Sequence, residues 1–437
     1  MTKNIDTLVK DLVMTDDMGT KEQIAQEIHA QAKKQNIYLS SIHDVYIARG
    51  KGKGPDFTVP AINLRCLTYD LARAIFRVAK KNDSGTFIFE IAKSEMGYTN
   101  QPPLEYAGVI LGAAIKENYS GPVFIQGDHF QIKAKNYFTD PKKEVEALKT
   151  VSRDGIAAGF YNIDIDSSTI VDLQKSTLAE QQHDNCTVCA ELAKYIRKIQ
   201  PKGITVSVGG EIGEVGGKNS TVEELEAFMD GVNAQLSSGM HGLSKISVQT
   251  GTSHGGVVLP DGTVAKVKVD FDTLKKLSQF SKKKYGLGGA VQHGASTLPQ
   301  EAFNKFPEME TIEIHLATNF QNMMYDSPLF PNDLKQKMYA WLKENATEER
   351  KEGQTEEQFI YKARKKALGS FKKDIMSLPE NIRDGIAKEI EKNFDFLFKK
   401  LNSVNTRKFV NELVKPVDVS IGLPKAMAAV FDGEGDD

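Results

Sequence analysis

Residues 123–129 read Val-Phe-Ile-Gln-Gly-Asp-His, a short apolar run that ends on a carboxylate and an imidazole. Seven further runs are also apolar and rich in Val, Ile or Phe, which is typical of strands buried on both faces of a parallel sheet. The eight predicted strands are 57–63, 86–91, 123–126, 161–165, 205–209, 246–249, 290–292 and 311–315. Segments with helical spacing separate them, such as 71–79. Eight strand-helix repeats predict an α/β protein, a (β/α)8 TIM barrel.

A doubly wound open sheet is the structural alternative. Its phosphate fingerprint, Gly-x-Gly-x-x-Gly after the first strand, is missing, because that strand continues into Leu64-Arg65-Cys66-Leu67. The barrel lies within residues 57–330, between an N-terminal helical extension (1–56) and a C-terminal helical extension (331–437). We expect two helical stretches in the first extension and an exposed Gly/Lys-rich connection at 49–55.

Composition excludes several classes of protein. The 437 residues are 40% apolar and 26% charged with a net charge of -2, which describes an ordinary globular protein without a nucleic-acid partner. No apolar run approaches the roughly 20 residues that span a bilayer, and the first residues lack the apolar core of a signal peptide, so we expect a cytoplasmic protein without a membrane partner. Cys186 and Cys189 form a lone Cys-x-x-Cys with no second pair, which favours a structural role.

Charged segments of the C-terminal extension are expected to face solvent. The runs 348–352 and 363–366 are predicted to be solvated helix faces, although a basic residue among them could instead contact a substrate phosphate. The acidic end, 432–437, is predicted to be disordered.

Polar side chains lie where several predicted strands end, at the edge of a barrel where active sites are built. They are Asp128, His129, Asp166, Glu211, His254 and His293. The other histidines that look scattered, at 29, 43, 183 and 241, are expected to have surface or capping roles.

Three of these strand-end residues are histidines, and three neutral imidazoles make a catalytic zinc site with one open coordination position. Asp128 is adjacent to His129 and supplies the non-ligand carboxylate that metal-assisted proton transfer needs. Glu211 and Asp166 are expected to provide an outer metal position or to orient the imidazoles. The alternative for Glu211 is a structural carboxylate that accepts hydrogen bonds from loop amides. Asp164 is the weaker candidate beside Asp166.

Two loops after the last two strands suit an anion, namely Gly294-Ala295-Ser296-Thr297 and Thr318-Asn319. Barrels frequently hold phosphate there with backbone amides and hydroxyls. Glycines on both sides of His254, including Gly255, permit close approach of the backbone. Together with a metal site, these loops predict a phosphorylated substrate.

From about Val59 to Gln321 the chain resembles the class II, metal-dependent fructose-bisphosphate aldolases. The motifs that carry the resemblance are Gly127-Asp128-His129, Ile165-Asp166-Ser167, Glu211-Ile212-Gly213, Gly251-Thr252-Ser253-His254-Gly255 and His293-Gly294-Ala295-Ser296. The resemblance implies a homo-oligomeric glycolytic lyase that cleaves a ketose (bis)phosphate, such as fructose 1,6-bisphosphate, to dihydroxyacetone phosphate and an aldehyde. Tagatose 1,6-bisphosphate as substrate, or a noncatalytic binding or stabilising subunit, are the alternatives.

The resemblance also assigns roles to residues. It makes His129, His254 and His293 the ligands of Zn²⁺ or another divalent ion such as Co²⁺, with a monovalent cation as an optional second ion. Asp128 becomes the acid/base, and Glu211 and Asp166 the alternative metal position. The resemblance also makes Gly255, Gly294 and Ser296 the residues that hold the substrate phosphate, and the loop after the eighth strand adds Thr318 to this set.

The chain departs from the family after the eighth strand. The family usually has Asn-x-Asp-Thr-Asp there, whereas this chain has His315-Leu316-Ala317-Thr318-Asn319. His315 replaces the substrate-contacting asparagine, and is either a substrate contact or a core residue at the barrel mouth. Ala317 replaces a carboxylate, so an altered sugar preference is expected.

Overall fold

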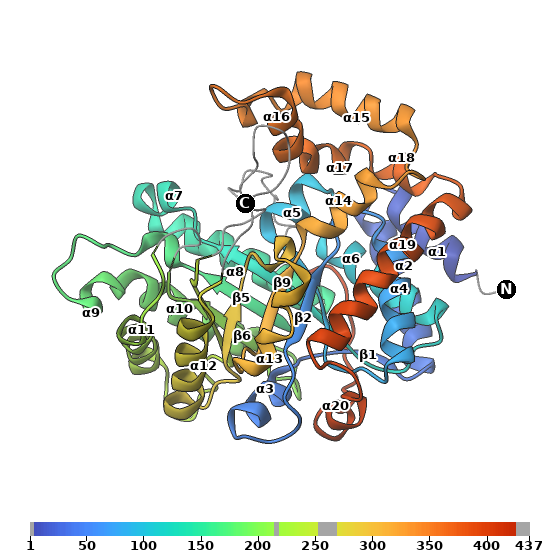
Figure 1. Ribbon diagram of the computed structural model, residues 1–437. Coiled ribbons are helices and arrows are strands. Elements are labelled where there is room, and N and C mark those ends of the chain that lie inside the picture. Colours follow the sequence, from blue (N-terminus) through green and yellow to red (C-terminus); the bar gives the residue numbers. More distant parts are fainter. Residues whose placement is uncertain (1–3, 214–217, 252–268, 425–437) are drawn as a thin grey trace.

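The computed structural model describes residues 4–213, 218–251 and 269–424, and its centre is a closed parallel barrel (Figure 1). Its strands are β2 (Val59–Asn63), β3 (Ile88–Ala92), β4 (Gly121–Gln131), β5 (Asn162–Asp166), β6 (Ser207–Glu211), β7 (Lys245–Val248), β8 (Ala290–Gln292) and β9 (Glu313–Leu316). Neighbouring strands pair in the order β4-β3-β2-β9-β8-β7-β6-β5, and pairing of β4 with β5 closes the ring. The predicted (β/α)8 TIM barrel is confirmed.

Helices surround the barrel. Those between the strands are α4 (Thr68–Lys81), α5 (Lys93–Tyr98), α6 (Pro103–Lys116), α7 (Ala134–Thr139), α8 (Pro141–Ala158), α9 (Leu178–Gln181), α10 (His183–Ile199), α11 (Val222–Gln235), α12 (Phe271–Tyr285) and α13 (Lys305–Glu308). Local sequence sets their ends: α8 begins after Asp140, whose carboxylate accepts from the Lys143 amide at 3.1 Å. It ends on Gly159, whose φ of 100° is costly for a residue with a side chain.

The N-terminal extension contains more structure than the sequence predicted. It holds α1 (Ile5–Met14), α2 (Met18–Lys34), β1 (Ile37–Ser40) and α3 (His43–Gly50), so a strand and a third helix join the two expected helical stretches. β1 pairs in parallel with the beginning of β4, from Ile37 opposite Gly121 to Ser40 opposite Phe124. His29 and His43 are buried rather than at the surface, because α2 and α3 pack against the barrel. His183 and His241 are exposed as expected.

After β9 the chain forms α14 (Thr318–Asp326), α15 (Asn332–Asn345), α16 (Glu356–Ala363), α17 (Ala367–Ser370), α18 (Lys372–Met376), α19 (Glu380–Lys400) and α20 (Arg407–Leu413). Helices α15 to α18 gather beyond α5 and α14 at one end of the molecule (Figure 1). From there α19 runs back along the barrel, where Arg383 at its start binds Asp70 of α4 at 2.8 Å. The segment 425–437, with the predicted disordered acidic end, lies outside the described residues.

The basic run 363–366 is not a solvated helix face. Arg364 and Lys365 are buried. The Arg364 guanidinium stacks over the ring of Tyr361 at 4.8 Å, and the Lys365 ammonium lies 5.5 Å from the ring centre of Tyr98. Contacts between cations and aromatic faces compensate for the water that these side chains lose, so the prediction of solvation was wrong for both residues.

Burial also fits a structural role for the cysteine pair. Cys186 and Cys189 are buried in α10 as free thiols, and loss of water raises the pKa of both above the usual range. In the described parts of the chain, no helix has the length and apolar character needed to cross a membrane.

Candidate active site

A bulge in β4 directs Asp128 and His129 into the barrel mouth. Gly127 pairs with Ile163 and Phe130 with Ile165, so β4 advances one residue more than β5. His129 takes up the extra residue with a φ of 38°, which is unusual for a residue with a side chain. A side chain at Gly127 would lie 2.3 Å from the Phe130 ring. The strained backbone at His129 costs conformational free energy, and backbone strain of this kind is often found at functional sites.

The structure brings most of the predicted site residues together. The Nδ1 atom of His129 lies 3.2 Å from an Asp166 carboxylate oxygen and 3.6 Å from one of Glu211. The His293 ring lies between two others in tilted contacts, with its centre 4.1 Å from that of His129 and 4.0 Å from that of His315. All five side chains are buried. Residues 252–268, which include His254 and Gly255, lie outside the described residues.

The donor set suits a divalent cation. Ligand atoms of His129, Glu211 and His293 all lie within 4.8 Å of one another, and a second set within the same distance joins Asp128, His293 and His315. Imidazole nitrogens and carboxylate oxygens are ligands that Zn²⁺ and similar ions accept. A third set within this distance joins Glu90, Glu313 and His315.

The electrostatics of the same site also favour a cation. Burial alone would lower the pKa of His129, but Asp128, Asp166 and Glu211 raise it well above 6.5. Burial raises the pKa of Glu211 well above 4.5, and the nearby Asp166 carboxylate adds to that shift. Such crowding of carboxylates around imidazoles produces a negative potential that a bound divalent ion would neutralise.

The expected phosphate loops meet beside the histidines. Gly294 has a φ of 69° that opens a short turn, and within this turn the Ser296 hydroxyl accepts a hydrogen bond from the Ala317 amide at 2.6 Å. Thr318 begins α14, and no side chain caps this helix end. Backbone N–H groups of the first turn therefore lie near Ser296, an arrangement that suits an anion.

A charged layer inside the barrel was not foreseen from the sequence. We use this name for Glu90, Asp164, Lys245 and Glu313, which come from the alternate strands β3, β5, β7 and β9 and are all buried. The Lys245 ammonium lies 2.9 Å from Asp164 and 2.5 Å from Glu313. Barrel interiors are usually filled by branched apolar side chains. Lys245 directly precedes the predicted strand 246–249 and Glu313 lies within the predicted strand 311–315. Only the alternation of inward-facing positions across the strands could have indicated that both point into the barrel.

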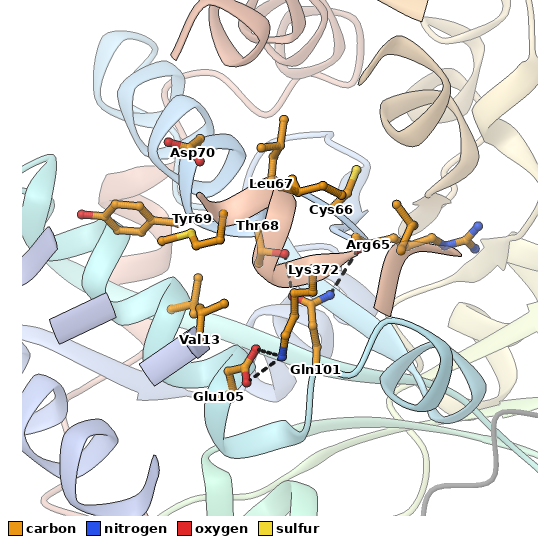
Figure 2. Close-up of a pocket in the computed structure, with 14 residues that line it drawn as sticks. Val13, Arg65, Cys66, Leu67, Thr68, Tyr69, Asp70, Gln101, Glu105 and Lys372 are labelled. Atoms are coloured by element: carbon orange, nitrogen blue, oxygen red, sulfur yellow. Dashed lines mark hydrogen bonds and ion pairs between the residues drawn. The ribbon is translucent and has the colours of Figure 1, made fainter. Parts of the chain in front are cut away.

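A small cavity of about 40 Å³ lies outside this site. Figure 2 shows it between the turn after β2, α6 and α18, where Lys372 binds both carboxylate oxygens of Glu105 at 2.9 and 3.0 Å. No predicted metal-binding or catalytic residue is among the fourteen that line it. The candidate active site is therefore the barrel mouth.

Comparison with known proteins identifies a family that matches most of this chain. The family model of the class-II fructose-bisphosphate aldolases matches residues 50–393, whereas no curated protein matches the chain.

Solved structures are similar to this chain to different degrees. A probable tagatose 6-phosphate kinase from Sinorhizobium meliloti is similar with a TM-score of 0.55 and 13% identity, over 81% of this chain and 99% of that one. A fructose-bisphosphate aldolase from Campylobacter jejuni has a TM-score of 0.48 and 17% identity, over 87% of this chain and 95% of that one. Because the family model spans most of the 437 residues, the chain belongs to the class-II fructose-bisphosphate aldolase family.

Proposed function

We propose that this protein is a metal-dependent aldolase that reversibly cleaves a ketose (bis)phosphate, fructose 1,6-bisphosphate in the first instance, to dihydroxyacetone phosphate and an aldehyde. The observation that carries the proposal is the meeting of Asp128, His129, Glu211 and His293 at the mouth of a barrel of this family. A purely structural barrel has no physical need for convergent imidazoles beside buried carboxylates.

His129, His254 and His293 are the proposed ligands of Zn²⁺ or Co²⁺, with Glu211 and Asp166 as the alternative position. A divalent ion bound there would act as a Lewis acid that polarises the carbonyl of the substrate. The 3.2 Å contact of Asp166 with His129 supports its role, because a carboxylate in contact with a ligating imidazole orients the ring.

Asp128 is the proposed acid/base. In cleavage its carboxylate takes the proton from the hydroxyl beside the scissile carbon-carbon bond, and the carbonyl of the released aldehyde forms as that bond breaks. The electron pair of the bond stays on the dihydroxyacetone phosphate fragment, which takes a proton at that carbon before it is released. In condensation the same carboxyl group returns the proton to the aldehyde oxygen. Its position on the β4 bulge places it next to His129 at the mouth.

The substrate phosphate is held, in this proposal, by Gly255, Gly294, Ser296 and Thr318. The short distance between the Ser296 turn and the first turn of α14 supports this assignment.

Lys245 is not a candidate for Schiff-base chemistry. Burial alone would lower the pKa of its ammonium, but Asp164 and Glu313 raise it. A lysine held protonated by two carboxylates is a poor nucleophile.

The His254→Ala variant tests the metal site and the activity together. It should lose stoichiometric Zn²⁺ or Co²⁺ and ketose-phosphate cleavage in one step, while His183→Ala, a matched change of an exposed histidine, should keep both. Metal content is measured by mass spectrometry of the purified proteins, and cleavage by a coupled assay for dihydroxyacetone phosphate. Full metal occupancy in His254→Ala would contradict the assignment of His254 as a ligand. A native protein that purifies without metal and cleaves no ketose phosphate would favour a noncatalytic binding subunit.

A further inference from the structure

His315 is surrounded by carboxylates rather than directed only toward the space a substrate would enter. Its Nδ1 atom lies 2.9 Å from Glu90 and 3.1 Å from Asp128. Its Nε2 atom lies 2.7 Å from Glu313 and 3.7 Å from Asp164. Both ring nitrogens are therefore within contact distance of protein oxygens.

Glu313 is held in turn by groups deeper in the barrel. Its carboxylate accepts from Lys245 at 2.5 Å, from the Gln126 amide at 2.9 Å and from the Tyr46 hydroxyl. Although burial alone would raise the pKa of Glu313, Lys245 and His315 hold it at about 2. Glu313 is thus an ionised carboxylate with a fixed orientation beneath His315.

The backbone makes room for this arrangement. A side chain at Gly209 would lie 2.4 Å from an Asp164 carboxylate oxygen and 3.0 Å from the Lys245 side chain. The space next to Lys245 is therefore filled by ion-pairing groups and has no room for a methyl group. Four charged groups in a barrel interior cost free energy of desolvation that packed apolar residues would not. A role beyond stability is expected for such a layer.

We propose that Glu313 and His315 form a relay that positions the Asp128 carboxylate for proton transfer. This inference rests on the proposed function, because it gives Asp128 the role of acid/base. Lys245 holds Glu313 by a hydrogen bond, and the Glu313 and Asp128 carboxylates lie at ion-pair distances of 2.7 Å from Nε2 and 3.1 Å from Nδ1 of the His315 ring. Asp128 lies within the β4 bulge, directly before the strained residue His129, so a contact that holds its side chain in one orientation would serve its role. His315 and Glu313 act through Asp128 and are positioning residues.

The relay and a direct substrate contact by His315 predict different kinetics. Glu313 is fully buried below His315, so a relay requires Glu313→Gln to lower kcat about tenfold with KM and metal content unchanged. His315→Asn keeps a donor near Asp128 but loses the contact with Glu313, and it should lower kcat by a similar factor. A substrate contact would instead change KM, and would leave Glu313→Gln close to the native protein.

A double-mutant cycle is the sharpest test. If Glu313 acts through His315, the double variant should be no slower than the slower single variant, because residues that act as one unit have non-additive effects. Glu105→Gln is the matched control, since it neutralises a carboxylate that is also buried and bound to two lysines but lies outside the site. It should lose stability without losing kcat. Multiplied losses in the double variant, or an unchanged kcat in Glu313→Gln, would overturn the relay.

A spectroscopic readout separates this inference from the proposed function. In nitrogen NMR of the histidine side chains, Asp128→Asn should shift Nδ1 of His315, and Glu313→Gln should shift Nε2 and Nδ1 together. A native protein that cleaves no ketose phosphate refutes the proposed function. If the protein is active but the Nδ1 signal of His315 is the same in the native protein, in Asp128→Asn and in Glu313→Gln, the relay is refuted. If Glu313→Gln does not fold, Lys245→Arg tests the same chain of contacts, with the same expected fall in kcat.

Discussion

Replacement of Lys245 by methionine should cost about 3–5 kcal/mol of the free energy of unfolding at pH 7, the range for removing one partner of a buried ion pair. The side chain of Lys245 is 1% exposed, and its ammonium contacts Asp164, Glu313 and the Gln126 amide oxygen at 2.9, 2.5 and 2.7 Å. With methionine there, two buried carboxylates keep no ammonium partner.

The pKa of Glu313 supports the same direction. Lys245 and His315 together hold it at about 2 in the folded protein against an ordinary 4.5, so Lys245 supplies part of a stabilisation on the order of a few kcal/mol. Because the folded pKa is lowered, this stabilisation is present above pH 4.5 and is lost as the pH falls toward 2. At pH 7 it is fully present, so its loss is measurable there.

Urea denaturation followed by circular dichroism measures the effect. The control is a variant that also carries Asp164→Asn and Glu313→Gln, which neutralises the two carboxylates that Lys245 contacts. It should recover most of the lost stability, since two neutral amides of similar volume avoid the desolvation of carboxylates that have lost their ammonium partner. A Lys245→Met protein within about 1 kcal/mol of the native one would show that the charged layer is not a coupled ion network.

Three further outcomes are expected. Asp128→Ala should keep its metal and bind ketose phosphate but cleave it at least about a hundredfold more slowly; near-normal turnover in a steady-state assay would exclude the acid/base role. Ala317→Asp should restore an acceptor for a substrate hydroxyl and raise fructose 1,6-bisphosphate cleavage about tenfold or more relative to other ketose phosphates. If the native protein already cleaves fructose 1,6-bisphosphate efficiently and Ala317→Asp does not improve it, the altered sugar preference is contradicted. Burial lowers the pKa of His43 to about 3, so the unfolded chain binds the proton first as the pH falls. The contribution of neutral His43 to the free energy of unfolding is therefore fully present above about pH 6.5 and is lost progressively below it. Between pH 7 and pH 5, His43→Gln should therefore lose about 2 kcal/mol less than the native protein in urea denaturation, and equal losses would contradict the burial argument.

The barrel could be predicted because its strands are buried on both faces. Each predicted run overlaps one strand from β2 to β9, and 290–292 coincides with β8. β1 was missed because Ile37–Ser40 is a four-residue run, and its partner is the beginning of a strand already assigned to the barrel. Hydrophobic pattern alone does not distinguish so short a strand from the end of a helix.

The candidate site was predictable only in its outer parts. Asp128, His129, Asp166, Glu211 and His293 follow strands directly, and parallel strands in a barrel bring such ends together. The charged layer could not be predicted, because a single sequence shows which residues are apolar but not which charged residues find partners in the interior. The burial of His43 and Arg364 escaped prediction for the same reason: each depends on elements distant in the sequence.

The most direct test of the proposed metal-dependent aldolase is the rate of fructose 1,6-bisphosphate cleavage in three samples of one preparation: as purified, after treatment with a chelator, and after return of one equivalent of Zn²⁺ or Co²⁺. We predict activity in the first sample, loss of nearly all of it in the second and recovery in the third, with tagatose 1,6-bisphosphate assayed in parallel. Cleavage that survives complete removal of the metal, or no cleavage of either sugar by the metal-loaded protein, would contradict it.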